Sequence, residues 1–275
     1  MKKRVKVLFL VVAILAMIFT GCQKVDSTEV SEKLVIGVAP GPYGDMFKTA
    51  IQPQLQERGY VIEVKEFSDY VLPNQALANK EITANMFQHA VYLEKFSQDH
   101  NLELSPVINI PTAAVGLYSN TIKSLDELAE GSVVTIASDP TNLARALRLL
   151  EAAGLITISE NVDPTTASEK DVVENPKNLQ ITPVEAAQLP RTLESADLAA
   201  INGNFAIAAG IDLSTAIVME TLEEPYKNLI AVRTEDLDKE FVKDIKEIVQ
   251  SEAFREAINN PNDIFSGFQK PDWFE

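Results

Sequence analysis

The segment from residue 139 to residue 145 carries the residues best suited to holding a charged group. Asp139 can cap a helix that begins at Pro140, because a carboxylate accepts from free backbone N–H groups and proline has none to satisfy. Asn142 and Arg145 are three residues apart and share a face of that helix. A guanidinium near a helix N-terminus suits a carboxylate, and each such bond contributes about 1.5–3 kcal/mol. The pattern alone leaves open that Arg145 is a solvated surface residue.

Two side-chain amides surround a glycine further along the chain, at Asn202, Gly203 and Asn204. They follow an apolar run at residues 198–201 and precede a short run of small residues that reads as a helix. Glycine lets the backbone approach a ligand closely, and each amide both donates and accepts hydrogen bonds. The segment is equally compatible with an ordinary turn.

A third group, Tyr70, Phe87, His89 and Tyr92, lies at the ends of two earlier apolar runs. These rings could wall an apolar pocket. His89 and Tyr92 are also three residues apart with Phe96 a turn further, and that spacing by itself favours core packing. Metal binding by His89 is a weak alternative, because aromatic neighbours are poor ligands for a divalent ion.

Enzyme signatures are missing from the sequence. No serine stands in a Gly-x-Ser-x-Gly context, there is no phosphate-binding or dinucleotide-binding glycine motif, and His89 and His100 lack metal-ligand spacing. We therefore expect no catalytic residues, no metal site and no cofactor.

These residues must be positioned by alternating strands and helices, which indicate an α/β fold with mostly parallel sheets. We expect residues 157–178 to be an irregular exposed excursion. Ligands of open α/β sheets lie beyond the carboxyl ends of strands, where all three groups fall. Strands are expected at 33–38, 61–67, 82–87, 107–110, 115–119, 133–137, 198–201, 217–219 and 229–232, and helices at 45–57, 88–96, 124–129, 141–153 and 241–259.

The first 22 residues have the composition of a lipoprotein signal. Four basic residues lie within the first six, an apolar run covers residues 7–19, and Thr20, Gly21 and Cys22 follow. The run is shorter than the ~20 residues of a membrane-spanning helix. The pattern resembles a lipobox with Phe19 in place of leucine, so we expect cleavage before Cys22 and lipidation of that residue. An ordinary signal with a chance cysteine is the alternative. Residues 22–32 are polar and read as a tether.

Charge and composition narrow the classes further. Loss of the signal leaves 20 basic against 40 acidic side chains, a formal charge of −20, which excludes surface binding to nucleic acid or anionic lipid. Cys22 is the only cysteine, so lipidation leaves no thiol for a disulfide or a nucleophile. An exported, anchored, acidic α/β chain is typical of a solute-binding protein that serves a membrane importer, although exported enzymes and adhesins share most of these features.

Short sequence segments of the mature chain resemble those of the NlpA-type methionine-binding lipoprotein family, the substrate-binding subunits of methionine ABC importers. The matching runs follow one order along nearly the whole mature chain, which makes them more specific than any single motif. They are GVAPGPYGDM (37–46), FSDYVLPNQAL (67–77), ANMFQHAVYL (84–93), GLYS (116–119), SDPTNLARALRLLEAAGLI (138–156), NPKNL (175–179), EAAQLPR (185–191), AINGNFA (200–206) and NLIAVR (228–233).

The resemblance implies a two-lobed periplasmic-binding-protein fold of type II-like architecture, with residues 33–117 plus 227–275 in one lobe, 118–226 in the other, and an amino acid, methionine first, in the cleft between them. It implies an ABC permease and its ATPase as partners, and an anchored position on the extracytoplasmic face of the cell membrane. The implied ligand residues are Tyr70, Phe87, His89 and Tyr92 around the side chain, Arg145 and Asn142 at the carboxylate, and Asn202 and Asn204 at the backbone of the amino acid.

Several positions depart from the family pattern, namely Tyr43, Val91, Ala137 with Ser138, and Ala144. They leave open the D-isomer, the sulfoxide, another apolar amino acid or a methionyl dipeptide. A thioether gains roughly 0.3–1.5 kcal/mol from aromatic ring edges. Leucine would bury similar area, so the pocket wall discriminates by only ~1–3 kcal/mol.

Overall fold

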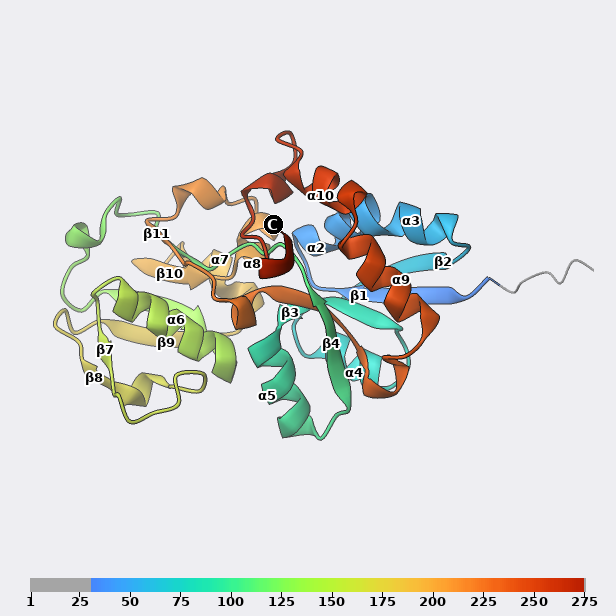
Figure 1. Cartoon of the computed structure of the whole chain (residues 1–275). Helices are drawn as coiled ribbons and strands as arrows, with labels where there is room; N and C mark the ends of the chain where they lie inside the picture. Colours follow the sequence, from blue (N-terminus) through green and yellow to red (C-terminus); the bar gives the residue numbers. More distant parts are fainter. Residues whose placement is uncertain (1–30, 275) are drawn as a thin grey trace, which may run out of the picture. The chain divides into compact units, whose positions relative to one another are not determined.

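The computed structural model describes residues 31–274 and contains two five-stranded sheets flanked by helices (Figure 1). The first sheet has the strand order β2-β1-β3-β12-β4, and the second has the order β11-β5-β10-β6-β9. A third, two-stranded sheet pairs β7 with β8. Two helix-flanked sheets are what the predicted α/β, two-lobed fold class requires.

The elements are short and alternate along the chain. The strands are β1 Lys33–Val38, β2 Val61–Glu66, β3 Ala84–His89, β4 Leu104–Asn109, β5 Gly116–Tyr118, β6 Val133–Ala137, β7 Thr157–Ile158, β8 Val172–Glu174, β9 Gln180–Val184, β10 Leu198–Ile201, β11 Val218–Met219 and β12 Asn228–Arg233. The helices are α2 Pro42–Met46, a π-helical turn at Phe47–Ile51, α3 Gln52–Glu57, α4 Leu72–Ala78, α5 Ala90–His100, α6 Pro140–Ala152, α7 Leu189–Thr192, α8 Gly203–Ala208, α9 Glu240–Val249 and α10 Glu252–Asn259.

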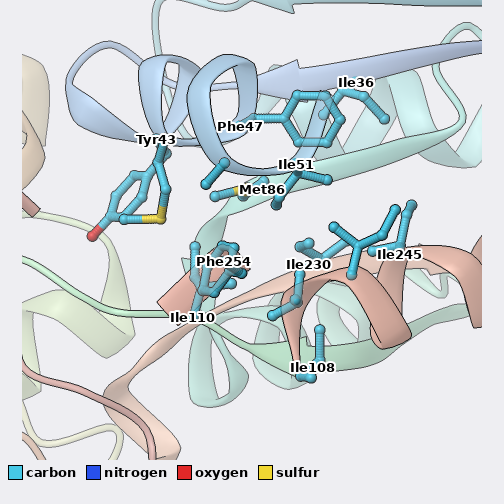
Figure 2. Packing of buried hydrophobic residues seen from close by; sticks show 14 of the residues in the cluster. Ile36, Tyr43, Phe47, Ile51, Met86, Ile108, Ile110, Ile230, Ile245 and Phe254 are labelled. Atoms are coloured by element: carbon cyan, nitrogen blue, oxygen red, sulfur yellow. The ribbon is translucent and has the colours of Figure 1, made fainter. Parts of the chain in front are cut away.

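The first sheet is apolar on both faces because its strands alternate side chains between two helical layers. On one face, Ile230 of β12 packs with Ile245 of α9 and Phe254 of α10, as Figure 2 shows. On the other face, Leu229 of β12 packs with Leu93 of α5. Figure 1 accordingly shows α2, α3, α9 and α10 on one side of this sheet and α4 and α5 on the other.

The second sheet is built by the same rule. Ala200 of β10 faces a core formed with Leu147 and Leu150 of α6. Ala199 of the same strand faces the opposite way, towards Leu189 of α7. Helix α6, the helix that carries Asn142 and Arg145, is therefore held against the sheet by its apolar stripe.

Some elements differ from the sequence-based expectations. The single helix expected at 241–259 is wrong, because α9 ends at Val249 and Ser251 caps a second helix, α10, by accepting from the Phe254 N–H at 3.1 Å. The helix expected at 45–57 begins at Pro42 and widens to a π-turn just before Pro53, which has no N–H for a regular bond. The excursion at 157–178 contains β7 and β8, and β9 follows it.

The expectation of mostly parallel sheets is also wrong. Each five-stranded sheet has two parallel and two antiparallel pairings. The chain crosses from the first sheet to the second between β4 and β5, and it returns between β11 and β12. The strands on either side of these two crossings are the antiparallel ones. The predicted lobe boundaries, after residues 117 and 226, lie near these crossings and stay a prediction.

Cys22, the signal at residues 1–21 and nearly all of the predicted tether lie outside the described residues. Among residues 31–274, no helix is both long and apolar enough to cross a membrane.

Candidate functional site

A cavity is lined by residues of β3 and β12 in the first sheet and by residues of α6 and α8, the helices beside the second sheet. Its volume is about 20 Å³, so the lining side chains nearly fill the space. This is room for about one water molecule and lies far below the roughly 300–1,000 Å³ of ligand pockets. The lining residues are Tyr43, Tyr70, Phe87, Gln88, His89, Tyr92, Ala113, Asn142, Arg145, Asn202, Gly203, Asn204 and Asn228.

Arg145 is buried at the cavity wall, with 4% of its surface exposed, so the alternative of a solvated surface arginine is wrong. Its Nε and Nη2 atoms donate to the two carboxylate oxygens of Glu220 at 2.8 and 2.7 Å. Although burial disfavours its charge, the carboxylate of Glu220 keeps the pKa of Arg145 above the usual value. Within residues 31–274, Nη1 of Arg145 has no hydrogen-bond partner. One edge of the guanidinium is thus fixed and the other donor group is free for a ligand.

Asn142 is the centre of a polar network that joins three elements. Its Nδ2 donates to both carboxylate oxygens of Asp139, at 3.0 and 3.1 Å, and its backbone N–H donates to Oδ1 of the same residue at 3.0 Å. Asn202, just after β10, donates to Oδ1 of Asn142 at 2.9 Å. The predicted cap at Asp139 is thereby present, and it also orients the Asn142 amide toward the cavity wall.

His89 contributes a neutral imidazole to this network. The backbone N–H of Tyr92 donates to its Nδ1 at 3.1 Å, so the ring proton belongs on Nε2, which lies 3.4 Å from Oδ1 of Asn142. Burial, with the nearby positive charge of Arg145, lowers the pKa of His89 to about 3. At neutral pH the ring is therefore an uncharged donor.

The aromatic wall is formed by Tyr70, Phe87 and Tyr92, with ring centroids 5.8–6.2 Å apart. Tyr70 also packs at 4.9 Å on Phe205 of α8. The same rings belong to a buried cluster that continues to Phe96, so they serve core packing and the cavity wall together. The sequence posed core packing and a pocket wall as alternatives, and the structure shows that these rings form part of both.

The side chain of Asn204 is hydrogen-bonded on both its oxygen and its nitrogen, and it connects α8 to the part of the cavity wall that lies beside the first sheet. Its Oδ1 accepts from the Tyr70 hydroxyl at 2.6 Å, and its Nδ2 donates to the backbone oxygen of Pro40 at 2.9 Å. Gly41 follows with φ +117°, and a Cβ there would lie 2.5 Å from the Asn204 backbone oxygen. This close approach requires glycine.

All eight residues predicted for the ligand site line this one cavity and are buried. That they bind a ligand stays a prediction. Sequence reasoning missed Tyr43, Gln88, Ala113 and Asn228 as lining residues. Asn228 begins β12, which is antiparallel to β3 and places it opposite His89. A rule that searches only the carboxyl ends of strands cannot find such a residue.

The structure shows the surroundings of two positions that depart from the family pattern, Tyr43 and Ala144. The hydroxyl of Tyr43 accepts from the Ala113 N–H at 3.2 Å, inside the cavity lining. Ala144 belongs to the core beneath α6. Its methyl group therefore packs in the core below the helix.

No metal-ligand cluster is present among residues 31–274. No group of three or more histidine, cysteine, aspartate or glutamate side chains there could hold a metal ion. Burial raises the pKa of Tyr43 to about 12 and that of Tyr70 well above its usual value. The arrangement suits a ligand that carries a carboxylate and an apolar side chain.

Comparisons with known proteins identify chains that are similar over most of their length. The D-methionine-binding lipoprotein MetQ of Escherichia coli strain K12 is 41% identical over 243 residues, which cover 86% of this chain and 88% of that protein. A nutrient-binding protein from Burkholderia cenocepacia, solved bound to methionine, has a TM-score of 0.80 and 35% identity, covering 85% of this chain and 97% of that one. The crystal structure of the methionine-binding protein MetQ has a TM-score of 0.80 and 40% identity, covering 86% and 97%.

These solved structures confirm the predicted fold class. A family model described as NlpA lipoprotein matches residues 34–273, nearly the whole described chain. The chain therefore belongs to the NlpA lipoprotein family.

Proposed function

We propose that this protein is the extracytoplasmic substrate-binding subunit of an ABC importer and that its cavity binds a free amino acid, methionine first. The observation that carries the proposal is a buried guanidinium, that of Arg145, which keeps one donor group unpaired among the described residues and lines a cavity with a mainly aromatic and amide wall. The names of its relatives, a D-methionine-binding lipoprotein and a methionine-bound nutrient-binding protein, support the same ligand.

In this proposal the parts of the ligand are divided among the eight predicted residues. The α-carboxylate accepts from Nη1 of Arg145, which Glu220 holds in place, with help from Asn142. The ammonium group is met by amide oxygens from the Asn202 region, because no aspartate or glutamate is among the lining residues. The thioether lies against Tyr70, Phe87 and Tyr92, where sulfur–ring contacts add to burial.

Membrane retention is the second part of the proposal. Lipidation of Cys22 would tether the binding unit to the extracytoplasmic face of the cell membrane, beside a permease and its ATPase. The lipobox-like sequence and the lipoprotein names of the relatives support this arrangement.

Calorimetric titration of the purified protein tests the ligand. L- and D-methionine should bind, L-leucine should bind more weakly, and L-aspartate and L-lysine should not bind measurably, because their side-chain charges would have no partner against the rings. Phe87→Ala should weaken methionine and reduce the preference over leucine. A ranking with leucine or a methionyl dipeptide above methionine contradicts the named ligand, and no binding of any amino acid contradicts the function.

A further inference from the structure

The buried pair of Arg145 and Glu220 is electrically neutral as a unit. Two hydrogen bonds join the groups, and the side chains are only 5% and 14% exposed, so water screens the pair weakly. The carboxylate of Glu220 therefore offsets most of the positive field that Arg145 would otherwise project into the cavity.

Glu220 is fixed in this position by its surroundings. It follows β11, and its Oε2 accepts from the Val115 N–H at 3.1 Å, while its own N–H donates to the Val115 oxygen at 3.0 Å. Its backbone oxygen accepts from Nε2 of Gln269 at 2.6 Å. The carboxylate is thus built into the wall behind Arg145.

The other groups around the cavity supply no positive charge. Burial holds His89 neutral and raises the pKa values of Tyr43, Tyr70 and Tyr92. A further carboxyl, Asp139, accepts two hydrogen bonds from the Asn142 amide, and burial raises its pKa. Among the described lining residues, Arg145 carries the only formal charge, and Glu220 balances it.

We propose that Glu220 is a specificity-determining residue that makes the cavity select a ligand of zero net charge, one that brings an ammonium group together with its carboxylate. This inference rests on the proposed function. A ligand with the carboxylate alone adds an unbalanced negative charge to a site that is already neutral, and burial makes that charge costly. Specificity then arises from a repulsive element, Glu220, as much as from the attraction to Arg145.

The test compares two ligands of nearly the same shape. The hydroxy-acid analogue of L-methionine has a hydroxyl in place of the ammonium group and so carries only the carboxylate charge. The wild-type protein should bind L-methionine at least about tenfold more tightly than the analogue. In Glu220→Gln the positive charge of Arg145 is no longer offset, so the ratio of the two dissociation constants should fall by at least about tenfold.

Glu223→Gln is the matched control, because Glu223 lies in the same segment but pairs with Arg148 at 3.0 Å with its side chain 67% exposed. Its ratio should equal that of the wild type. If Glu220→Gln weakens the binding of both ligands by the same factor, Glu220 only holds the side chain of Arg145 in position, and the inference is overturned. If Glu220→Gln does not fold, the wild type decides, since equal binding of both ligands overturns the inference.

The two levels of the proposal fail differently. A wild-type protein that binds no amino acid contradicts the proposed function, and the inference with it. Methionine binding with an unchanged ratio in Glu220→Gln contradicts only the role of Glu220.

Discussion

The hydroxyl of Tyr70 donates to Oδ1 of Asn204 at 2.6 Å and joins the loop after β2 in the first sheet to α8 beside the second. Both residues are buried, and both line the cavity. Asn204 also donates from Nδ2 to the backbone oxygen of Pro40, so a side-chain donor and a backbone acceptor together join α8 to the first-sheet side of the cavity.

Tyr70→Phe should weaken methionine binding by about 1–3 kcal/mol, because Oδ1 of Asn204 loses its partner while the aromatic wall stays. Calorimetry on the variant measures this. Tyr60→Phe is the control, since its hydroxyl donates to Asp244 at 2.6 Å away from the cavity lining. It should lower the free energy of unfolding and leave the affinity unchanged. Equal affinities of wild type and Tyr70→Phe would show that the Tyr70 bond does not support the bound state.

Arg145→Ala should weaken methionine binding by at least ~2 kcal/mol, because the carboxylate loses its charged partner. It should also lower the free energy of unfolding by about 3–5 kcal/mol, since Glu220 is left buried and unpaired. Arg148→Ala, one turn further along α6, removes a partly exposed arginine that pairs with Glu223. Its affinity should stay within about 0.5 kcal/mol of the wild type. Unaltered affinity in Arg145→Ala would place the carboxylate elsewhere.

Stability should fall in acid through His89. Its pKa is about 3 in the folded protein and about 6.5 when unfolded. Between these values the unfolded chain binds a proton that the folded chain excludes. The stability contributed by neutral His89 is therefore present above about pH 6.5 and is lost toward pH 3, by up to about 1.4 kcal/mol per pH unit.

Denaturant unfolding of wild type and His89→Gln at several pH values isolates this effect. The difference between the two free energies of unfolding should change as the pH falls below about 6.5, in the direction that favours the variant. Methionine affinity of the wild type should stay level from about pH 5 to 8, where folded His89 is neutral. A step in affinity near pH 6.5 would mean that His89 titrates in the folded protein.

Cys22→Ser should release the protein from the membrane fraction, because serine cannot form the thioether that carries the lipid. Cell fractionation followed by immunoblotting measures the distribution. Methionine affinity of the purified variant should match the wild type, which separates anchoring from binding. A variant that stays quantitatively in the membrane would contradict lipidation at this residue.

The sequence predicted those parts of the site that depend on residues close together in the chain. The cap at Asp139, with Asn142 and Arg145 on one face of the helix, follows from residues close in sequence, and the structure contains that helix start. The Arg145–Glu220 pair joins residues 75 positions apart, and only the fold brings them together. Asn228 was missed for a similar reason, because it enters the cavity from the amino end of an antiparallel strand.

The missed elements have a local cause too. Pro183 lies in β9 and argues against a strand, yet β9 is at the edge of its sheet, where a missing N–H is tolerated. Conversely, the apolar period of residues 241–259 continues through the break at Ser251, so periodicity alone reads two helices as one.

Gly41 and Gly203 place bare backbone where the two halves touch. A Cβ at Gly41 would lie 2.5 Å from the backbone oxygen of Asn204, and one at Gly203 would lie 2.6 Å from that of Ala114. Main-chain atoms therefore form a rigid stop, which has no rotamers through which it could yield. A larger residue at either glycine would push the two backbone segments apart, because side-chain rotation cannot relieve the overlap.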